Sequence, residues 1–331
     1  MEELHFQLTH FHFKLPPKSL SFLEVGKQKP WVDKKLAEDQ FRSAFKEGIK
    51  YKLKQLKEGI KRETYTYAYF SKSFLDLLSQ FASSELEQLQ SYVQNKQIIL
   101  VGGCAFNSLS YLCSNSLFEQ EVRLHLATLE KYFESQPEVF INTACIYTDD
   151  MAEILIKAGY KGAFAGANQW HLGGKESQQL FKANTQKAFG LLLVEQQANA
   201  QNGIQLVNGW STAYDLQESN YFPQKRIRIE AEVLSNAPTY SVHLPISAGN
   251  WSFQITQYVS SGLQRTFLSE CKKLIESNEA VLNEQQLEAV LCLLQPTEMI
   301  KMRSGNEQES YGQFVNSMNL LTAIQLSSSR S

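Results

Sequence analysis

The sequence predicts an α/β protein with a mostly parallel sheet that forms a barrel. Through the first half of the chain, short apolar segments alternate with longer segments of helical periodicity. Repeated units of this kind build parallel sheets, because the helix carries the chain back to the starting edge of the sheet. From about residue 250 the pattern is mainly helical. We therefore expect a barrel domain over residues 1–245 and a helical region over 246–331 packed on the barrel.

The elements of the first half follow from periodicity and capping signals. Alternating apolar and polar residues over 4–13 predict the opening strand. Apolar residues at every third or fourth position over 34–60, with lysines between them, predict a helix with a solvated basic face. Ser71 or Ser73 is placed to cap the helix that follows the second strand. The other predicted elements here are strands at 65–70 and 97–101 and helices at 74–94 and 118–134.

The second half begins with the most informative strand. A strand at 139–142 precedes a helix at 151–158, which Asp149 or Asp150 could cap and which ends at Gly159. The remaining predictions are strands at 163–165, 189–194, 204–207, 227–233 and 240–244, then helices at 252–276, 284–294 and 311–326.

Composition narrows the class of protein. The 331 residues are 43% apolar and 20% charged, which is typical of a soluble protein with a sizeable core. A net charge of −2 argues against a general nucleic-acid or membrane surface. The five cysteines form no closely spaced pairs, which favours free thiols in a reducing compartment. With neither a signal peptide nor a membrane-spanning run, we expect a cytoplasmic protein, and we predict no cofactor or metal.

One segment carries the main resemblance. Residues 137–147 are Pro-Glu-Val-Phe-Ile-Asn-Thr-Ala-Cys-Ile-Tyr. This segment resembles the nucleophile-bearing segment of glycoside hydrolase family 57, the α-amylase-type retaining enzymes, which has Pro-x-Val-Phe-Arg-Asn-Thr-Glu-Leu-Ile-Tyr. The resemblance places Ala144 where the family has its catalytic glutamate. It implies an incomplete (β/α)7 TIM-like barrel with a helical C-terminal region.

Further segments resemble the family in the same order along nearly the whole chain. His10, followed by Lys14-Leu15, is similar to the His-Gln-Pro and Arg-Leu of its first motif. Residues 21–26 are similar to its Ser-Phe-Phe-Asp-Ile-Gly, and Asn107-Ser108-Leu109 to its His-Ser-Leu. The apolar run at 191–193 and the closing helix from Tyr311 also match in position.

The departures from the family concentrate on polar residues. Ile99 replaces a glutamate of the family, Asn107 replaces a histidine, and Ala165-Gly166 replaces a Glu-Gly pair. The family's acid-bearing run Asp-Tyr-Glu-Thr-Phe-Gly is missing, and Glu232 is the only acidic residue near its expected place. A retaining glycosidase needs two carboxyl groups about 5–5.5 Å apart. The resemblance therefore implies a fold kept without its reaction.

Several candidate site residues have a plainer explanation. His10 and His12 lie on one strand face at a spacing that suits two metal ligands, but two hydrogen-bonded histidines explain them better. Trp170-His171 follows a predicted barrel strand, where the tryptophan could stack on a sugar or simply cover the barrel mouth. Cys145 should face away from Ala144 on an alternating strand, so we discount it as a nucleophile. Asn107, Asn142, Thr143 and Tyr147 complete the candidate substrate-binding residues.

Three functions remain open from the sequence. The leading hypothesis is a catalytically degenerate α-amylase-like protein that binds an α-glucan or oligosaccharide, or partners a carbohydrate-active enzyme. The second is an active hydrolase or transferase that uses Glu232, Glu195 or Asp215 as carboxylates. The third is a structural subunit without a ligand. Paired carboxylates in one pocket would favour the second, and a filled barrel mouth would favour the third.

Overall fold

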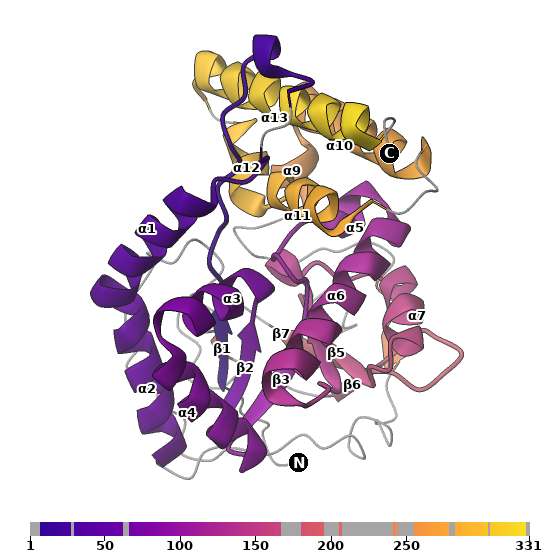
Figure 1. The fold of residues 1–331 in the computed structure, drawn as a ribbon. Helices are drawn as coiled ribbons and strands as arrows, with labels where there is room; N and C mark the ends of the chain where they lie inside the picture. The colour runs from indigo at the N-terminus through magenta and orange to yellow at the C-terminus, as the bar shows by residue number, and fades with distance from the viewer. Residues whose placement is uncertain are drawn as a thin grey trace.

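A computed structural model gives the arrangement of the chain (Figure 1). It describes residues 7–27, 30–61, 66–166, 180–194, 205–206, 241–242, 244, 255–277, 282–303 and 305–328.

Seven parallel strands form the barrel wall. Their order is β8-β1-β2-β3-β4-β5-β7, and every neighbouring pair in this series is parallel. Strand β6 then pairs antiparallel with β7 and parallel with β9. The sequence is thus folded as an incomplete (β/α)7 barrel with a helical C-terminal region. The strands are β1 (Gln7–Phe11), β2 (Thr66–Phe70), β3 (Ile98–Gly102), β4 (Val139–Ile141), β5 (Gly162–Gly166), β6 (Leu180–Ala183), β7 (Gly190–Val194), β8 (Gln205–Leu206) and β9 (Ser241–Val242).

Helices on the outside of the barrel connect these strands (Figure 1). The predicted helix at 34–60 is continuous but contains one π-helical turn, η2 (Phe45–Ile49). The predicted helix at 74–94 is two helices, because Ala82 leaves helical geometry with φ −151° and ψ 55°. The helices are α1 (Lys34–Ala44), α2 (Lys50–Lys61), α3 (Lys72–Phe81), α4 (Ser83–Gln94), α5 (Ser110–Cys113), α6 (Asn115–Phe133) and α7 (Asp149–Lys157).

The C-terminal helices gather at one end of the barrel (Figure 1). They meet the chain that leaves β1 and β3, so they lie at the carboxyl end of the sheet. Leu109 N donates to Leu294 O, and Asn316 and Asn319 hold the backbone of Leu20. The helices are α9 (Thr256–Val259), α10 (Gly262–Ser277), α11 (Glu284–Leu293), α12 (Pro296–Lys301) and α13 (Glu307–Ser328).

One buried apolar cluster joins the two parts. It contains Phe11, Phe41 and Phe74 from the barrel side together with Phe267 and Leu291 from the C-terminal helices. Burying a large apolar side chain stabilises a fold by about 1.5–3 kcal/mol. The shared cluster therefore couples the stability of the helical region to that of the barrel.

Two local predictions about capping come out differently. Ser71 caps α3, since its hydroxyl accepts from Phe74 N. The prediction that Asp149 or Asp150 caps the next helix is wrong, because Thr148 is the N-cap residue and its side chain makes no capping bond. Asp149 instead accepts from Leu244 N at 3.0 Å and ties the helix start to a distant segment.

No helix within the described ranges is long and apolar enough to cross a membrane.

Candidate active site

The loops after β3 and β4 lie side by side because their strands are parallel neighbours. Val101 pairs with Val139, and Gly102 with Phe140. Across the two loops, the Thr143 hydroxyl donates to Asn107 Oδ1 at 3.1 Å.

A second bond joins the same loops closer to the strands. The Cys104 thiol donates to Asn142 Oδ1 at 3.0 Å. Three of the residues singled out from the sequence, Asn107, Asn142 and Thr143, are therefore brought together at this end of the barrel, and all three are buried.

Both loops contain left-handed backbone. Asn107, Ala144 and Cys145 have φ values of 52°, 55° and 51°. A left-handed residue with a side chain costs roughly 1–2 kcal/mol, except that asparagine adopts the conformation more readily. The other left-handed non-glycine residues in the described ranges, Lys96 and Glu134, follow the ends of α4 and α6 by two residues and one residue, where this conformation is common. Strained backbone often marks a functional site.

Ala144 lies three residues after the end of β4, a central strand of the sheet. It is half-buried and packs against the main apolar cluster. Residues Thr143–Cys145 form a 3₁₀ turn and not the end of a strand, so the alternation used to orient Cys145 is not present. Cys145 is nonetheless buried, and burial raises the pKa of its thiol. The neutral thiol is a poor nucleophile.

A buried carboxylate holds the loop after β3. Glu121 of α6 accepts hydrogen bonds from Phe106 N at 2.9 Å and from the hydroxyls of Ser108 and Ser110 at 2.6 Å each. Burial raises the pKa of this carboxyl. Its role is to satisfy three donors that the fold removes from water.

His125, one turn further along α6, holds the start of the same loop. Its Nδ1 accepts from Gly103 N at 3.1 Å, so the proton must be on Nε2, which donates to Phe70 O at 2.8 Å. Burial lowers the pKa of His125 to about 4. The imidazole is therefore neutral and bridges β2 to the loop after β3.

Glu121 and His125 lie in the helix that the sequence predicts at 118–134, but neither was identified from the sequence as a functional residue. Both occupy the buried face of α6 together with Phe118, Val122 and Leu129. A charged and an imidazole side chain at core positions of an amphipathic helix is the signal that could have found them.

His10 of β1 and His12, just after that strand, both contact neighbouring side chains. His10 is buried and stacks on Tyr69 with ring centroids 4.5 Å apart, and Tyr69 stacks in turn on His125. His12 Nδ1 lies 3.0 Å from the Ser71 hydroxyl, and burial with the nearby Lys14 charge lowers its pKa to about 3. No group of three or more potential metal ligands occurs among the described side chains.

Lys14, in the segment that resembles the family's Arg-Leu, bonds a carboxylate of the helical region. Its ammonium group pairs with Glu298 of α12, which also accepts from Lys301 and from Gln313. Burial alone would raise the pKa of Glu298, but Lys14 beside it lowers the pKa overall. This cluster fixes the chain after β1 to the C-terminal helices.

Three carboxylates near these loops are already bonded within the protein. Glu121 and Glu298 accept three hydrogen bonds each, and Asp149 accepts from Leu244 N. Tyr147 is buried, and burial together with Asp149 raises the pKa of its phenol. Ile99 lies in β3, and Gly166 ends β5. Trp170, His171, Glu195, Asp215 and Glu232, together with the predicted strand at 227–233, lie outside the described residues.

Comparison with known proteins agrees with this architecture. The sequence profile of glycosyl hydrolase family 57 matches residues 7–207, which is more than half of the chain. No curated protein sequence matches.

Solved structures share the fold at low sequence identity. A family 57-type branching enzyme from Pyrococcus horikoshii has a TM-score of 0.62 at 10% identity, covering 97% of this chain and 88% of that one. The family 57 branching enzyme TK1436 from Thermococcus kodakaraensis has a TM-score of 0.56 at 10% identity, covering 97% and 89%. A 4-alpha-glucanotransferase from Thermococcus litoralis has a TM-score of 0.54 at 12% identity. The match covers 94% of this chain but spans only 55% of the glucanotransferase.

Proposed function

Because the chain belongs to glycosyl hydrolase family 57, we propose that it is a catalytically degenerate member that binds an α-glucan or oligosaccharide without cleaving it. The observation that carries the proposal is the alanine at position 144, three residues after the end of β4. A retaining enzyme attacks the sugar with a carboxylate and protonates the leaving oxygen with a second one. A methyl group cannot form the glycosyl ester.

The polar environment supports the same proposal. Glu121, Asp149 and Glu298 are committed to hydrogen bonds that hold loops and helices together. Releasing Glu121 for catalysis would leave three buried donors without a partner, at a cost of about 1–3 kcal/mol for each donor. Releasing Asp149 or Glu298 would break part-buried bonds to distant segments. Such a protein could also act as the partner of a carbohydrate-active enzyme, because binding a glycan needs no nucleophile.

The reaction itself is the first test. We expect the purified protein neither to hydrolyse maltoheptaose nor to transfer glucosyl units from it, because both reactions pass through the same glycosyl ester. Loss of a residue that acts within a catalytic unit typically removes about 10⁴–10⁶-fold of the rate. Chromatographic analysis of products over a day should match the enzyme-free blank.

Ala144→Glu should remain inactive as well. The new carboxylate would lack an aligned acid and the polar residues that Ile99, Asn107 and Gly166 replace. Steady turnover by the unmutated protein would contradict the proposal. Substantial rescue by Ala144→Glu would reveal a surviving general acid, and Glu232→Gln would be the variant to examine next.

Binding is the second test. Trp170 comes four residues after β5, and an aromatic face there suits the C–H face of a sugar. Trp170→Ala should weaken maltohexaose binding by about 1–3 kcal/mol in calorimetry. Trp170→Phe, which keeps an aromatic face, is the matched control and should retain most of the affinity. Failure of the unmutated protein to bind any α- or β-glucan would instead favour a structural subunit.

A further inference from the structure

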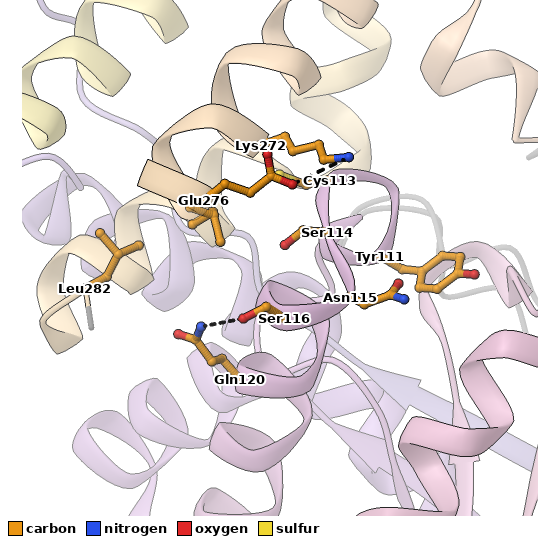
Figure 2. Close-up of a pocket in the computed structure, with 10 residues that line it drawn as sticks. Tyr111, Cys113, Ser114, Asn115, Ser116, Gln120, Lys272, Glu276 and Leu282 are labelled. Atoms are coloured by element: carbon orange, nitrogen blue, oxygen red, sulfur yellow. Dashed lines mark hydrogen bonds and ion pairs between the residues drawn. The ribbon is translucent and has the colours of Figure 1, made fainter. Parts of the chain in front are cut away.

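A second candidate ligand site lies away from the loops after β3 and β4. A cavity of about 780 Å³ separates the beginning of α6 from the end of α10 (Figure 2). Small-molecule sites typically occupy roughly 300–1,000 Å³. The rim residues Asn115, Ser116, Lys272 and Glu276 are exposed, so a ligand can enter from solvent.

The two charged residues described in the cavity lining form an ion pair with each other. Lys272 Nζ lies 3.6 Å from Glu276 Oε1, one turn along α10. Among the described residues of its lining, these two are the only Lys, Arg, Asp or Glu side chains. An anionic or cationic ligand would therefore find no excess of opposite charge, whereas a neutral polar ligand could bond both groups.

The remaining rim offers hydroxyl and amide groups. Gln120 Nε2 donates to Ser116 Oγ at 3.4 Å, a long bond that uses one of the four hydrogen-bonding positions of the amide. Asn115 adds a second amide, and Figure 2 shows it on the opposite side of Ser116 from Gln120. Amides can donate and accept at once, which suits the hydroxyl groups of a sugar.

The buried residues of the cavity lining are apolar. Cys113, Ile275 and Leu282 line it and are buried. A pyranose presents apolar C–H groups on its ring faces and hydroxyl groups at its edges. An apolar floor with a polar, electrically balanced rim matches this distribution, and ligand sites in general combine apolar lining with a few placed polar groups.

The cavity is connected to the candidate active site through α5. Tyr111 lines the cavity, and its hydroxyl lies 2.6 Å from Thr148 Oγ1 in the loop after β4. Ser110, next to it, bonds the buried Glu121. We propose that this cavity, between the α5–α6 corner and α10, is a binding site for a neutral oligosaccharide. The inference rests on the proposed glycan-binding function and assigns it a second, separate location.

A filling variant tests the site. Ser116→Trp should occupy the cavity and lower maltohexaose affinity by at least about tenfold in calorimetry, with Gln120→Ala lowering it roughly three- to tenfold through a lost hydrogen bond. Ala127→Trp places the same side chain at an exposed position of α6 outside the cavity lining and should bind like the unmutated protein. Thermal unfolding of each variant checks that the fold is intact. If Ser116→Trp does not fold, the affinity of Gln120→Ala tests the site instead.

The outcomes separate the two proposals. Full affinity in Ser116→Trp and Gln120→Ala, with weakened binding in Trp170→Ala, would overturn the cavity site and leave the proposed function standing. Absence of binding by the unmutated protein to maltohexaose and to the other glucans would overturn both. Weakened binding in Ser116→Trp and in Gln120→Ala, with Ala127→Trp unchanged, is the result we expect.

Discussion

The loops after β3 and β4 sit next to each other but are held in different ways. The loop after β3 is fastened from beneath by Glu121 and His125, which together accept four hydrogen bonds from it. The loop after β4 turns through two successive left-handed residues, Ala144 and Cys145. Glu121 and His125 satisfy buried donors, whereas position 144, which the sequence resemblance aligns with the family's nucleophile, carries only a methyl group. Under the proposed function, Glu121 and His125 are kept because they support the fold, and position 144 no longer takes part in chemistry.

Removing the carboxylate beneath the first loop should have the largest effect. Glu121→Ala removes the acceptor of three buried donors, which are Phe106 N and the hydroxyls of Ser108 and Ser110. We expect a loss of about 3–5 kcal/mol in the free energy of unfolding, measured with urea, since each stranded donor costs about 1–3 kcal/mol. Glu119→Ala, two residues away, removes only an exposed pair with Arg123 and should cost less than about 1 kcal/mol. Similar losses in both variants would contradict the role assigned to Glu121.

Acid should lower the stability that His125 gives to the loop after β3. The pKa of His125 is about 4 in the fold, against about 6.5 when unfolded, so the folded protein binds fewer protons between these values. The contribution of His125 to the free energy of unfolding is therefore fully present above pH 6.5. It falls by about 3 kcal/mol as the pH drops towards 4. His12, with a pKa lowered to about 3, acts in the same direction. In residues 142–148 only Cys145 and Tyr147 titrate, and both have raised pKa values.

Urea unfolding between pH 7 and pH 4.5 measures this dependence. His125→Gln should be less stable at pH 7 but lose less on acidification than the unmutated protein. His12→Gln provides the comparison outside the loop after β3. An unchanged pH dependence in His125→Gln would show that the neutral imidazole is not what makes this region sensitive to acid.

Periodicity predicted the barrel strands well but not the bonds between loops. Strands β1, β2, β3 and β7 and the long helices come from patterns that persist over five or more residues, whereas β4 and β5 come from apolar runs of three or four residues next to a clear helical pattern. The short elements β6, α5 and α12 were missed, because four to six residues carry too little periodicity. Glu121 and Lys14 acquire their roles from partners 11 to 284 positions away, which no local pattern reveals. The 3₁₀ turn at Ala144 was also missed, since the segment continues an apolar strand in sequence.

The smallest expected effect distinguishes the two left-handed turns. Ala144→Gly relieves a side chain at φ 55° and should stabilise the protein by at most about 1 kcal/mol, because glycine also gains freedom in the unfolded chain. Asn107→Gly has nearly the same φ but loses the oxygen that accepts from Thr143, and it should cost about 0.5–1.5 kcal/mol. Urea unfolding at pH 7 compares the two variants directly. Equal destabilisation by both would mean that the left-handed alanine is not strained, and that position 144 is constrained by packing against the apolar cluster and not by its backbone.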